Sequence, residues 1–263
     1  MESHGTGRPV LLIHGFGASL YTWRHLVPML ARDHEVVAVD LKGAGRAPKP
    51  ADGRYSVGDH ADCIAALIEQ RDWRDLTIVG HSFGGGVALA AIVGARLEGR
   101  VRNLVLIDSM AYRQAFPWFI RALRVPILGP LSVFLLPKAL EVRFVLRSAY
   151  HRPARITGEA VETYAAPLRQ PDGRRALIEM ARALPPRDAD ALAARYPDIA
   201  LPALIVWGRH DRIVPLSIGL RLHRAIRSSR LVVVDDAGHL PHEETPDAVR
   251  EVLGPFLDEP HGG

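Results

Sequence analysis

The strongest constraint on the fold is a regular alternation between short apolar runs and amphipathic stretches. Each run is nearly continuous in valine, leucine and isoleucine, which is typical of strands buried on both faces. The runs are Val10–Ile13, Val36–Val39, Leu76–Val79, Leu104–Ile107, Leu204–Trp207 and Leu231–Val234. Helical patterns follow at Val57–Gln70, Gly84–Leu97, Leu216–Ile226 and Pro246–Leu257. Strand and helix in alternation predict an α/β fold, a parallel sheet covered by helices on both faces.

The alternation stops between about residues 111 and 198. This stretch contains helical patterns and ten prolines but no convincing strand. We expect it to be a helical cap, residues 111–198, inserted in a core made of residues 1–110 and 199–263. Its part from Phe116 to Leu136 is strongly apolar, but arginines and prolines interrupt it, which argues against a transmembrane helix. Weak attachment of the cap to a membrane surface stays open.

Composition narrows the class of protein further. The chain has 263 residues, of which 48% are hydrophobic and 24% charged, as in ordinary globular proteins, so a disordered chain is excluded. The single cysteine, Cys63, allows no intrachain disulfide, and we expect it to be packed on a helix. The first residues lack the pattern of a signal peptide, so a cytoplasmic location is expected.

The net charge of +4 does not indicate a nucleic-acid partner. The cap carries an excess of six positive charges, whereas the rest of the chain is slightly acidic. Only three of the basic residues are lysines, and no basic stripe with interleaved aromatic residues is present. We therefore expect no nucleic-acid binding.

A candidate nucleophile lies directly after the third apolar run. Residues 80–84 read Gly-His-Ser-Phe-Gly and match the pattern G-x-S-x-G between a predicted strand and a predicted helix. That setting is what a nucleophile elbow requires, because the glycines relieve crowding at a sharp turn that projects the hydroxyl of Ser82. The amides at the start of the next helix favour developing negative charge.

A serine hydroxyl needs a base, and a base needs an orienting acid. Asp211 follows the strand that ends near Trp207, and His239 follows the last predicted strand. Each lies past the carboxyl end of a strand, where open α/β sheets form their sites. The order serine, aspartate, histidine is that of the α/β-hydrolases. Asp108, which also ends a strand, is an alternative acid.

The chain resembles the α/β-hydrolase superfamily from Pro9 to Leu257. Besides the elbow and the triad order, residues 14–17 (His-Gly-Phe-Gly) are similar to its oxyanion loop, and residues 40–45 to its D-x-x-G-x-G turn. The resemblance implies an α/β-hydrolase fold with a six-stranded, all-parallel sheet in the family order 4-3-5-6-7-8. The first core strand begins by Val10, so the chain before it has no room for an antiparallel N-terminal hairpin.

The resemblance also implies the roles of the site residues. Ser82 would attack an acyl carbonyl, His239 would act as base and then acid, and Asp211 would orient His239. The backbone N–H groups of Phe16 and Phe83 would form the oxyanion hole. The reaction would need no cofactor and no metal.

Other polar residues near these motifs receive simpler interpretations. Asp40 is expected to tie its glycine turn together, and His14 to support the oxyanion loop. His81 is expected to line the site, and His210 to be a loop residue. His242 and Glu243 together with His239 could suggest a metal, but no third and fourth ligand is evident.

The expected activity is hydrolysis, through an acyl-enzyme, of a small-molecule carboxylic ester with a medium-sized apolar acyl or alcohol part. A serine at position 82 argues against the related dehalogenases and epoxide hydrolases, which use aspartate there. The C–C bond hydrolases of ring-cleavage products remain an alternative, although His81 and Leu240 stand where they usually have asparagine and tryptophan. A catalytically silent ligand-binding protein is the second alternative.

The substrate pocket is expected to come from the cap. Its apolar residues would supply both the cap core and the acyl-pocket wall, and they include Phe116, Trp118, Phe119, Leu123, Ile127, Leu128, Phe134 and Leu135.

Overall fold

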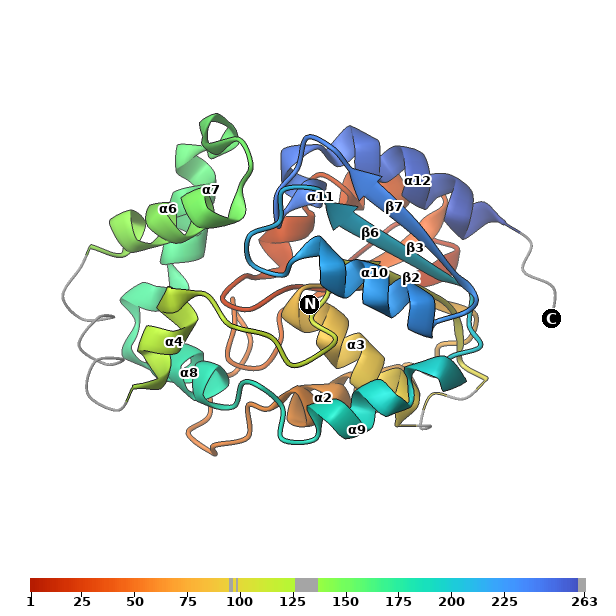
Figure 1. The fold of residues 1–263 in the computed structure, drawn as a ribbon, viewed down its shortest axis with the longest axis horizontal. Helices are drawn as coiled ribbons and strands as arrows, with labels where there is room; N and C mark the ends of the chain where they lie inside the picture. Colours follow the sequence, from red (N-terminus) through yellow and green to blue (C-terminus); the bar gives the residue numbers. More distant parts are fainter. Residues whose placement is uncertain (95–96, 98, 126–136, 260–263) are drawn as a thin grey trace.

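The computed structural model describes residues 1–94, 97, 99–125 and 137–259 and has the predicted α/β-hydrolase fold (Figure 1). Its core is one seven-stranded sheet in the order β1-β3-β2-β4-β5-β6-β7. The strands are β1 (Glu2–His4), β2 (Arg8–Ile13), β3 (His34–Val39), β4 (Leu76–His81), β5 (Val101–Ile107), β6 (Ala203–Gly208) and β7 (Ser229–Val234). All six strands expected from the apolar runs are present, and their mutual pairing is parallel.

The prediction of six all-parallel strands was wrong in one respect. A three-residue strand, β1, pairs antiparallel with β3 at the edge of the sheet, with Ser3 opposite Val37. Its residues are half-buried or exposed, so it is held by backbone pairing and has no apolar pattern to detect. Gly5 and Gly7 have positive φ and turn the chain back towards β2, which accommodates the extra strand.

Both faces of the sheet are buried, as the continuous apolar runs predict. In β2, Leu11 and Ile13 join one hydrophobic cluster, whereas Val10 and Leu12 join the other. This division follows from the two-residue period of a strand. The first cluster is completed by α2, α3 and α10, and the second by η1, α1 and α12.

The helices match the amphipathic stretches closely, and α2 begins and ends where the sequence predicts. Outside the segment between β5 and β6 they are η1 (Leu20–Trp23), α1 (Val27–Leu30), α2 (Val57–Gln70), α3 (Phe83–Val93), α10 (Leu216–Ala225), α11 (Pro241–Glu244) and α12 (Pro246–Asp258). The start of α2 is fixed by a capping box, in which Ser56 and Asp59 satisfy each other's backbone amides.

The described residues between β5 and β6 form helices and no strand. They are α4 (Trp118–Arg124), α6 (Lys138–Ala149), η2 (Pro153–Arg155), α7 (Gly158–Ala165), η3 (Pro167–Arg169), α8 (Pro171–Arg182), α9 (Ala189–Ala194) and η4 (Tyr196–Asp198). Two pairs, α4 with α8 and α6 with α7, stand beside the sheet at the left of Figure 1. In contrast, α9 and η4 lie along the core, where η4 contacts α3 and α10.

Within the described ranges, no helix is long and apolar enough to cross a membrane. The apolar stretch from Phe116 to Leu136 is described only as far as Val125, and α4 ends at Arg124. Ile127, Leu128, Phe134 and Leu135 lie outside the described residues. The cytoplasmic location stays a prediction.

Candidate active site

Ser82 occupies a strained turn between β4 and α3. Its φ is +51° and its ψ is −117°, a conformation that residues with a side chain rarely adopt. Hydrogen bonds fix the turn on both sides, because the amide of Ser82 donates to Ile107 and its carbonyl accepts from Gly85, Gly86 and Met110. The fixed turn holds the hydroxyl at the carboxyl end of the sheet, as the elbow pattern predicts.

The glycines flanking Ser82 allow a close approach of backbones. A Cβ atom on Gly84 would lie 2.3 Å from the carbonyl oxygen of Ile13 and 2.5 Å from that of His14. A Cβ atom on Gly80 would lie 2.7 Å from the carbonyl oxygen of Gly84. Backbone atoms cannot move aside as flexible side chains do, so both positions require glycine.

The structure brings Ser82, His239 and Asp211 together in one hydrogen-bonded chain. The Oγ of Ser82 lies 2.9 Å from Nε2 of His239, and Nδ1 of His239 lies 2.8 Å from Oδ2 of Asp211. Oδ1 of Asp211 accepts from the amides of Ile213 and Val214. With Nδ1–H donating to Asp211, the free lone pair of Nε2 faces the serine proton, which is the arrangement of a general base.

Asp108, the alternative acid, is buried beside Asp211 but makes no hydrogen bond to His239. Its Oδ1 accepts from the amide of Gly208 at 3.0 Å, and Oδ2 has no hydrogen-bond partner among the described residues. Burial, together with the nearby charge of Asp211, raises the pKa of Asp108 well above its usual value. The geometry therefore places Asp211, and not Asp108, against the imidazole.

The two amides predicted for the oxyanion hole lie beside the elbow. Phe83 is the first residue of α3, and neither its amide nor that of Phe16 donates to another described residue. The loop of Phe16 packs tightly on the elbow, since a Cβ atom on Gly15 would lie 3.1 Å from Cβ of Ser82. Two unpaired donors next to the serine suit a developing negative charge.

His14 and Asp40 hold the surrounding loops. The amide of Leu41 donates to Nε2 of His14 at 3.0 Å. The other ring nitrogen of His14, Nδ1, therefore carries the proton and donates to the carbonyl of Gly15. The carboxylate of Asp40 accepts from the amides of Leu20 and Arg46, which ties the glycine turn together. Both residues have the supporting positions that the sequence analysis expects.

The imidazole of His81 contacts the backbone of His239. Its Nε2 lies 2.8 Å from the carbonyl oxygen of His239, and its ring is 4.6 Å from that of His242. Burial, together with these two histidines, lowers the pKa of His81 well below its usual value, and burial lowers that of His242 to about 3. Both are therefore neutral at pH 7, and His81 can fix the backbone of His239.

The sequence analysis missed the role of Glu243, which it weighed only as a metal ligand. Its buried carboxylate accepts hydrogen bonds from Arg24, Thr22, Tyr150 and Tyr164, at distances from 2.6 to 3.0 Å. Burial alone would raise the pKa of Glu243, but Arg24 and these donors hold it below its usual value. The two tyrosines come from the segment between β5 and β6, so Glu243 joins that segment to the core.

Glu244 makes a second connection of the same kind. One oxygen accepts from the amide of Gly238, and the other accepts from the amides of His151 and Arg152. The amide of His239 itself donates to the carbonyl of Ala149, the last residue of α6, at 2.7 Å. The loop that carries the histidine is thus held directly by the end of α6. The sequence gives little indication of this connection: the two acidic residues are adjacent, in a short helix that apolar residues flank.

His210, by contrast, lies in an exposed loop as expected, where its ring stacks on that of His151 at 3.8 Å.

A cavity of about 540 Å³ opens next to Ser82 and His239. Its wall is mainly apolar, and Phe116, Trp118, Phe119 and Leu123 contribute to it as the sequence analysis predicts. No lysine or arginine is among the described residues that line it. Its polar side chains other than the site residues are those of Gln114, Glu141 and Tyr164.

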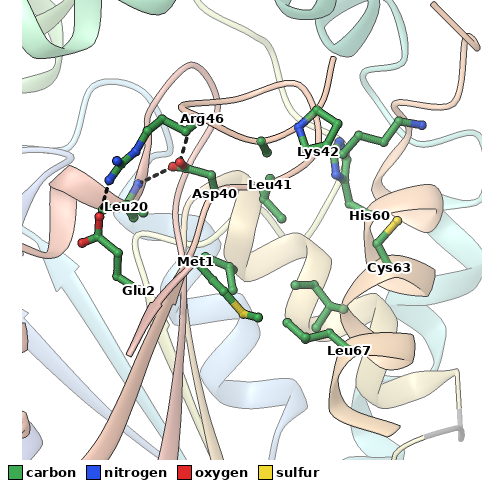
Figure 2. A pocket seen from close by; sticks show the side chains of 14 residues that line it. Met1, Glu2, Leu20, Asp40, Leu41, Lys42, Arg46, His60, Cys63 and Leu67 are labelled. Atoms are coloured by element: carbon green, nitrogen blue, oxygen red, sulfur yellow. Dashed lines mark hydrogen bonds and ion pairs between the residues drawn. The ribbon is translucent and has the colours of Figure 1, made fainter. Parts of the chain in front are cut away.

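A second cavity, of about 530 Å³, lies between β3, the turn after it and α2 (Figure 2). Its charged side chains are already engaged: Asp40 accepts from the amides of Leu20 and Arg46, the guanidinium of Arg46 pairs with Glu2, and Lys42 binds Asp52. Cys63 lines this cavity and is exposed, so the expectation that it is packed was wrong. The reason is its position on α2, whose buried face passes through Ile64 and Ile68 and leaves Cys63 on the flank.

Within the described residues, one group could offer three ligands to a metal ion: Asp108, Asp211 and His239, whose ligand atoms lie within 4.8 Å of one another. The hydrogen bond between His239 and Asp211 already engages two of these atoms. His242 does not join them, because its Nε2 lies 2.7 Å from the hydroxyl of Thr22. Two of the three candidate ligand atoms are therefore already bound to each other by a hydrogen bond.

Comparison with known proteins supports the resemblance to the α/β-hydrolases. The model of the alpha/beta hydrolase family matches residues 10–252, and the chain belongs to this family of hydrolases. It is 31% identical to the 2-hydroxymuconate semialdehyde hydrolase of a Pseudomonas species, over 98% of this chain and 90% of that one. It is 34% identical to the pimeloyl-[acyl-carrier protein] methyl ester esterase of Neisseria meningitidis, over 97% of this chain and 80% of that one.

Solved structures agree with these relatives. A meta-cleavage product hydrolase from Pseudomonas fluorescens superimposes with a TM-score of 0.83 and 28% identity, over 98% of this chain and 93% of that one. The relatives thus include both ester and C–C bond hydrolases, and similarity alone does not choose between the two activities.

We predict that Gly84→Ala lowers both stability and activity. The new methyl group meets backbone carbonyls, so α3 must move away from β2 and carry the amide of Phe83 with it. We expect a loss of about 1–3 kcal/mol in the free energy of unfolding and of about 10²-fold in turnover. Urea unfolding and ester hydrolysis measure the two effects. Gly58→Ala is the control, since its Cβ has ordinary contacts; equal behaviour of the two variants would contradict the prediction.

We also predict that Asp108→Asn stabilises the protein increasingly as pH rises. The pKa of Asp108 is raised on folding, so above its ordinary value, 3.8, the folded state retains a proton that the unfolded state loses. This lowers the stability of the wild type by up to about 1.4 kcal/mol per pH unit until the folded pKa is reached. Asparagine keeps the acceptor for Gly208 and has no such dependence.

Urea unfolding from pH 4 to 8 measures this difference. Asp33→Asn, at an exposed carboxyl group, serves as the control for replacing an aspartate by asparagine. A flat difference for Asp108→Asn would contradict the prediction and mean that Asp108 is ionised in the folded protein.

Proposed function

We propose that this protein is a cofactor-independent serine hydrolase that cleaves a carboxylic ester through an acyl-enzyme. The observation that carries the proposal is the hydrogen-bonded chain from Ser82 through His239 to Asp211. A buried serine on a strained turn, with an oriented imidazole at 2.9 Å, has the geometry of an activated nucleophile.

The proposed reaction has two halves. In the first, Nε2 of His239 takes the proton of Ser82 while Oγ attacks the ester carbonyl, and the amides of Phe16 and Phe83 hold the oxyanion. The imidazolium then gives its proton to the leaving alkoxide, and Ser82 remains acylated. In the second, His239 takes a proton from water, hydroxide attacks the acyl carbon, and Ser82 regains its proton as the acid leaves. Asp211 stabilises the imidazolium in both halves.

The apolar cavity supports an uncharged acyl or alcohol part as substrate. A chain of methylene groups gains about 0.8 kcal/mol for each group buried. We propose that residues 111–198 form the cap over this cavity, with α4 and α6 as its walls. The boundaries of the cap stay a prediction.

The alternative is hydrolysis of a C–C bond in a ring-cleavage product by the same triad. It is favoured by the similarity to the 2-hydroxymuconate semialdehyde and meta-cleavage product hydrolases. The substrate named in the first of these is an acid, whereas the described cavity wall carries no cation to pair with a carboxylate. The ester is therefore our first candidate.

We predict that Ser82→Ala lowers the hydrolysis of p-nitrophenyl butyrate by at least about 10⁴-fold, because the nucleophile is lost. Ser217→Ala, at an exposed serine of α10, is the matched control and should keep wild-type activity. A phosphonate ester should label wild type at one site and leave Ser82→Ala unlabelled. Labelling without turnover of any ester would instead favour the ligand-binding alternative. Turnover of a ring-cleavage dienone, without turnover of esters, would favour the C–C hydrolase.

We predict that Val145→Glu penalises long acyl chains selectively. Val145 lines the cavity on α6, and a carboxylate there would have to be desolvated by the bound chain. Across p-nitrophenyl esters, kcat/KM for octanoate should fall by at least about tenfold, whereas that for acetate should change by less than about threefold. An equal loss for both esters would show that the chain does not lie along α6.

A further inference from the structure

Exposed apolar side chains gather at the mouth of the cavity. Trp118 is 61% exposed, Leu140 57% and Phe144 53%, and all three also line the cavity. The rings of Trp118 and Phe144 are 5.5 Å apart, so α4 and α6 present one surface at the cavity, the mouth patch, made of Trp118, Leu140 and Phe144. Among the other described residues, only Met1, Val125 and Leu220 are large hydrophobic residues with comparable exposure.

The same two helices carry four exposed arginines around the mouth patch: Arg121, Arg124, Arg143 and Arg147. Arg121 follows Trp118 by three residues, and Arg147 follows Phe144 by three, which places each on the same helix face as its aromatic neighbour. In the described part of the chain, no ion pair or hydrogen bond engages these four guanidinium groups. Glu141, the one acid of the two helices, is bound by Lys138 at 2.8 Å.

These properties select one kind of partner. Aromatic rings with one wet edge suit the boundary between lipid headgroups and acyl chains, and unpaired arginines are attracted to an anionic surface. An apolar cavity that opens in the middle of such a patch gives an acyl chain a path from that boundary to Ser82. Without a bound partner, about half of each large side chain of the mouth patch would remain in contact with water.

We propose that the mouth patch docks the protein on an anionic lipid surface, with α4 and α6 lying against the headgroups. This goes beyond ester hydrolysis, since docking uses neither Ser82 nor His239. A Ser82→Ala protein should therefore dock as the wild type does, and the two proposals can fail separately.

The protein contains its own reporter for docking. Trp118 is exposed, whereas the other three tryptophans, Trp23, Trp73 and Trp207, are buried. Vesicles of phosphatidylcholine with one third phosphatidylglycerol should shift the tryptophan emission to the blue and co-sediment the protein. Vesicles of phosphatidylcholine alone should do neither, and about 0.5 M NaCl should release the protein from the anionic vesicles.

Charge reversal identifies the surface. Arg121→Glu with Arg147→Glu should lower the affinity for anionic vesicles by at least about tenfold, since each arginine near such a surface contributes roughly fivefold. Arg224→Glu with Arg227→Glu, which changes the net charge equally outside the patch, is the matched control and should bind as wild type does. Both double variants should unfold at the wild-type temperature, which excludes a folding defect.

Several results would overturn the proposal. These are the absence of a blue shift with anionic vesicles, an equal loss of binding in the two double variants, or equal binding to uncharged vesicles. A dimer whose formation buries Trp118, or capture by an acidic protein without vesicle binding, would assign the patch to a different partner.

Discussion

The site depends on how closely α3 approaches β2 at the turn that carries Ser82. No Cβ fits at Gly84, and the backbone of Ser82 is held in a left-handed conformation by hydrogen bonds to β5 and to the start of α3. Strain of this kind persists only where the surroundings enforce it. Here it is enforced by a sheet buried on both faces, which gives the turn a rigid support.

The position of the base, His239, is fixed by hydrogen bonds from other parts of the chain and not by a strained turn. His239 lies in a loop, and loops are ordinarily mobile. In this protein its amide is bound by Ala149 of α6, its carbonyl by His81, and its imidazole by Asp211. Glu243 and Glu244 add buried contacts from Tyr150, Tyr164 and the residues after α6. The helices α6 and α7 are therefore joined by hydrogen bonds to the loop that carries the base and to the helix that follows it.

Sequence reasoning predicted those parts of the fold that leave a periodic signal. Six strands and the helix Val57–Gln70 were found because burial on a face forces apolar residues into runs or stripes. The strand Glu2–His4 was missed because its residues are half-buried or exposed and form no apolar run, so its pairing with β3 leaves no pattern in the sequence. Cys63 was misplaced because a position on the flank of an amphipathic helix differs from a buried one by a small rotation.

The candidate site likewise contains residues that the sequence could predict and residues that it could not. Ser82, Asp211 and His239 could be named because each follows a strand in a recognisable order, and the structure brings them within hydrogen-bond distance. Glu243 could not be assigned its role, since its partners Arg24, Tyr150 and Tyr164 are far away in the sequence. The mouth patch likewise becomes visible only when α4 and α6 are seen side by side.

The most direct test of the account is to trap the covalent intermediate. The protein would be mixed with p-nitrophenyl butyrate, quenched with acid during the first turnovers, digested and mapped by mass spectrometry. The account predicts one butyryl group, on the peptide that contains Ser82 and on its hydroxyl. Turnover of the ester with an unmodified Ser82, or with the acyl group on another residue, would contradict it.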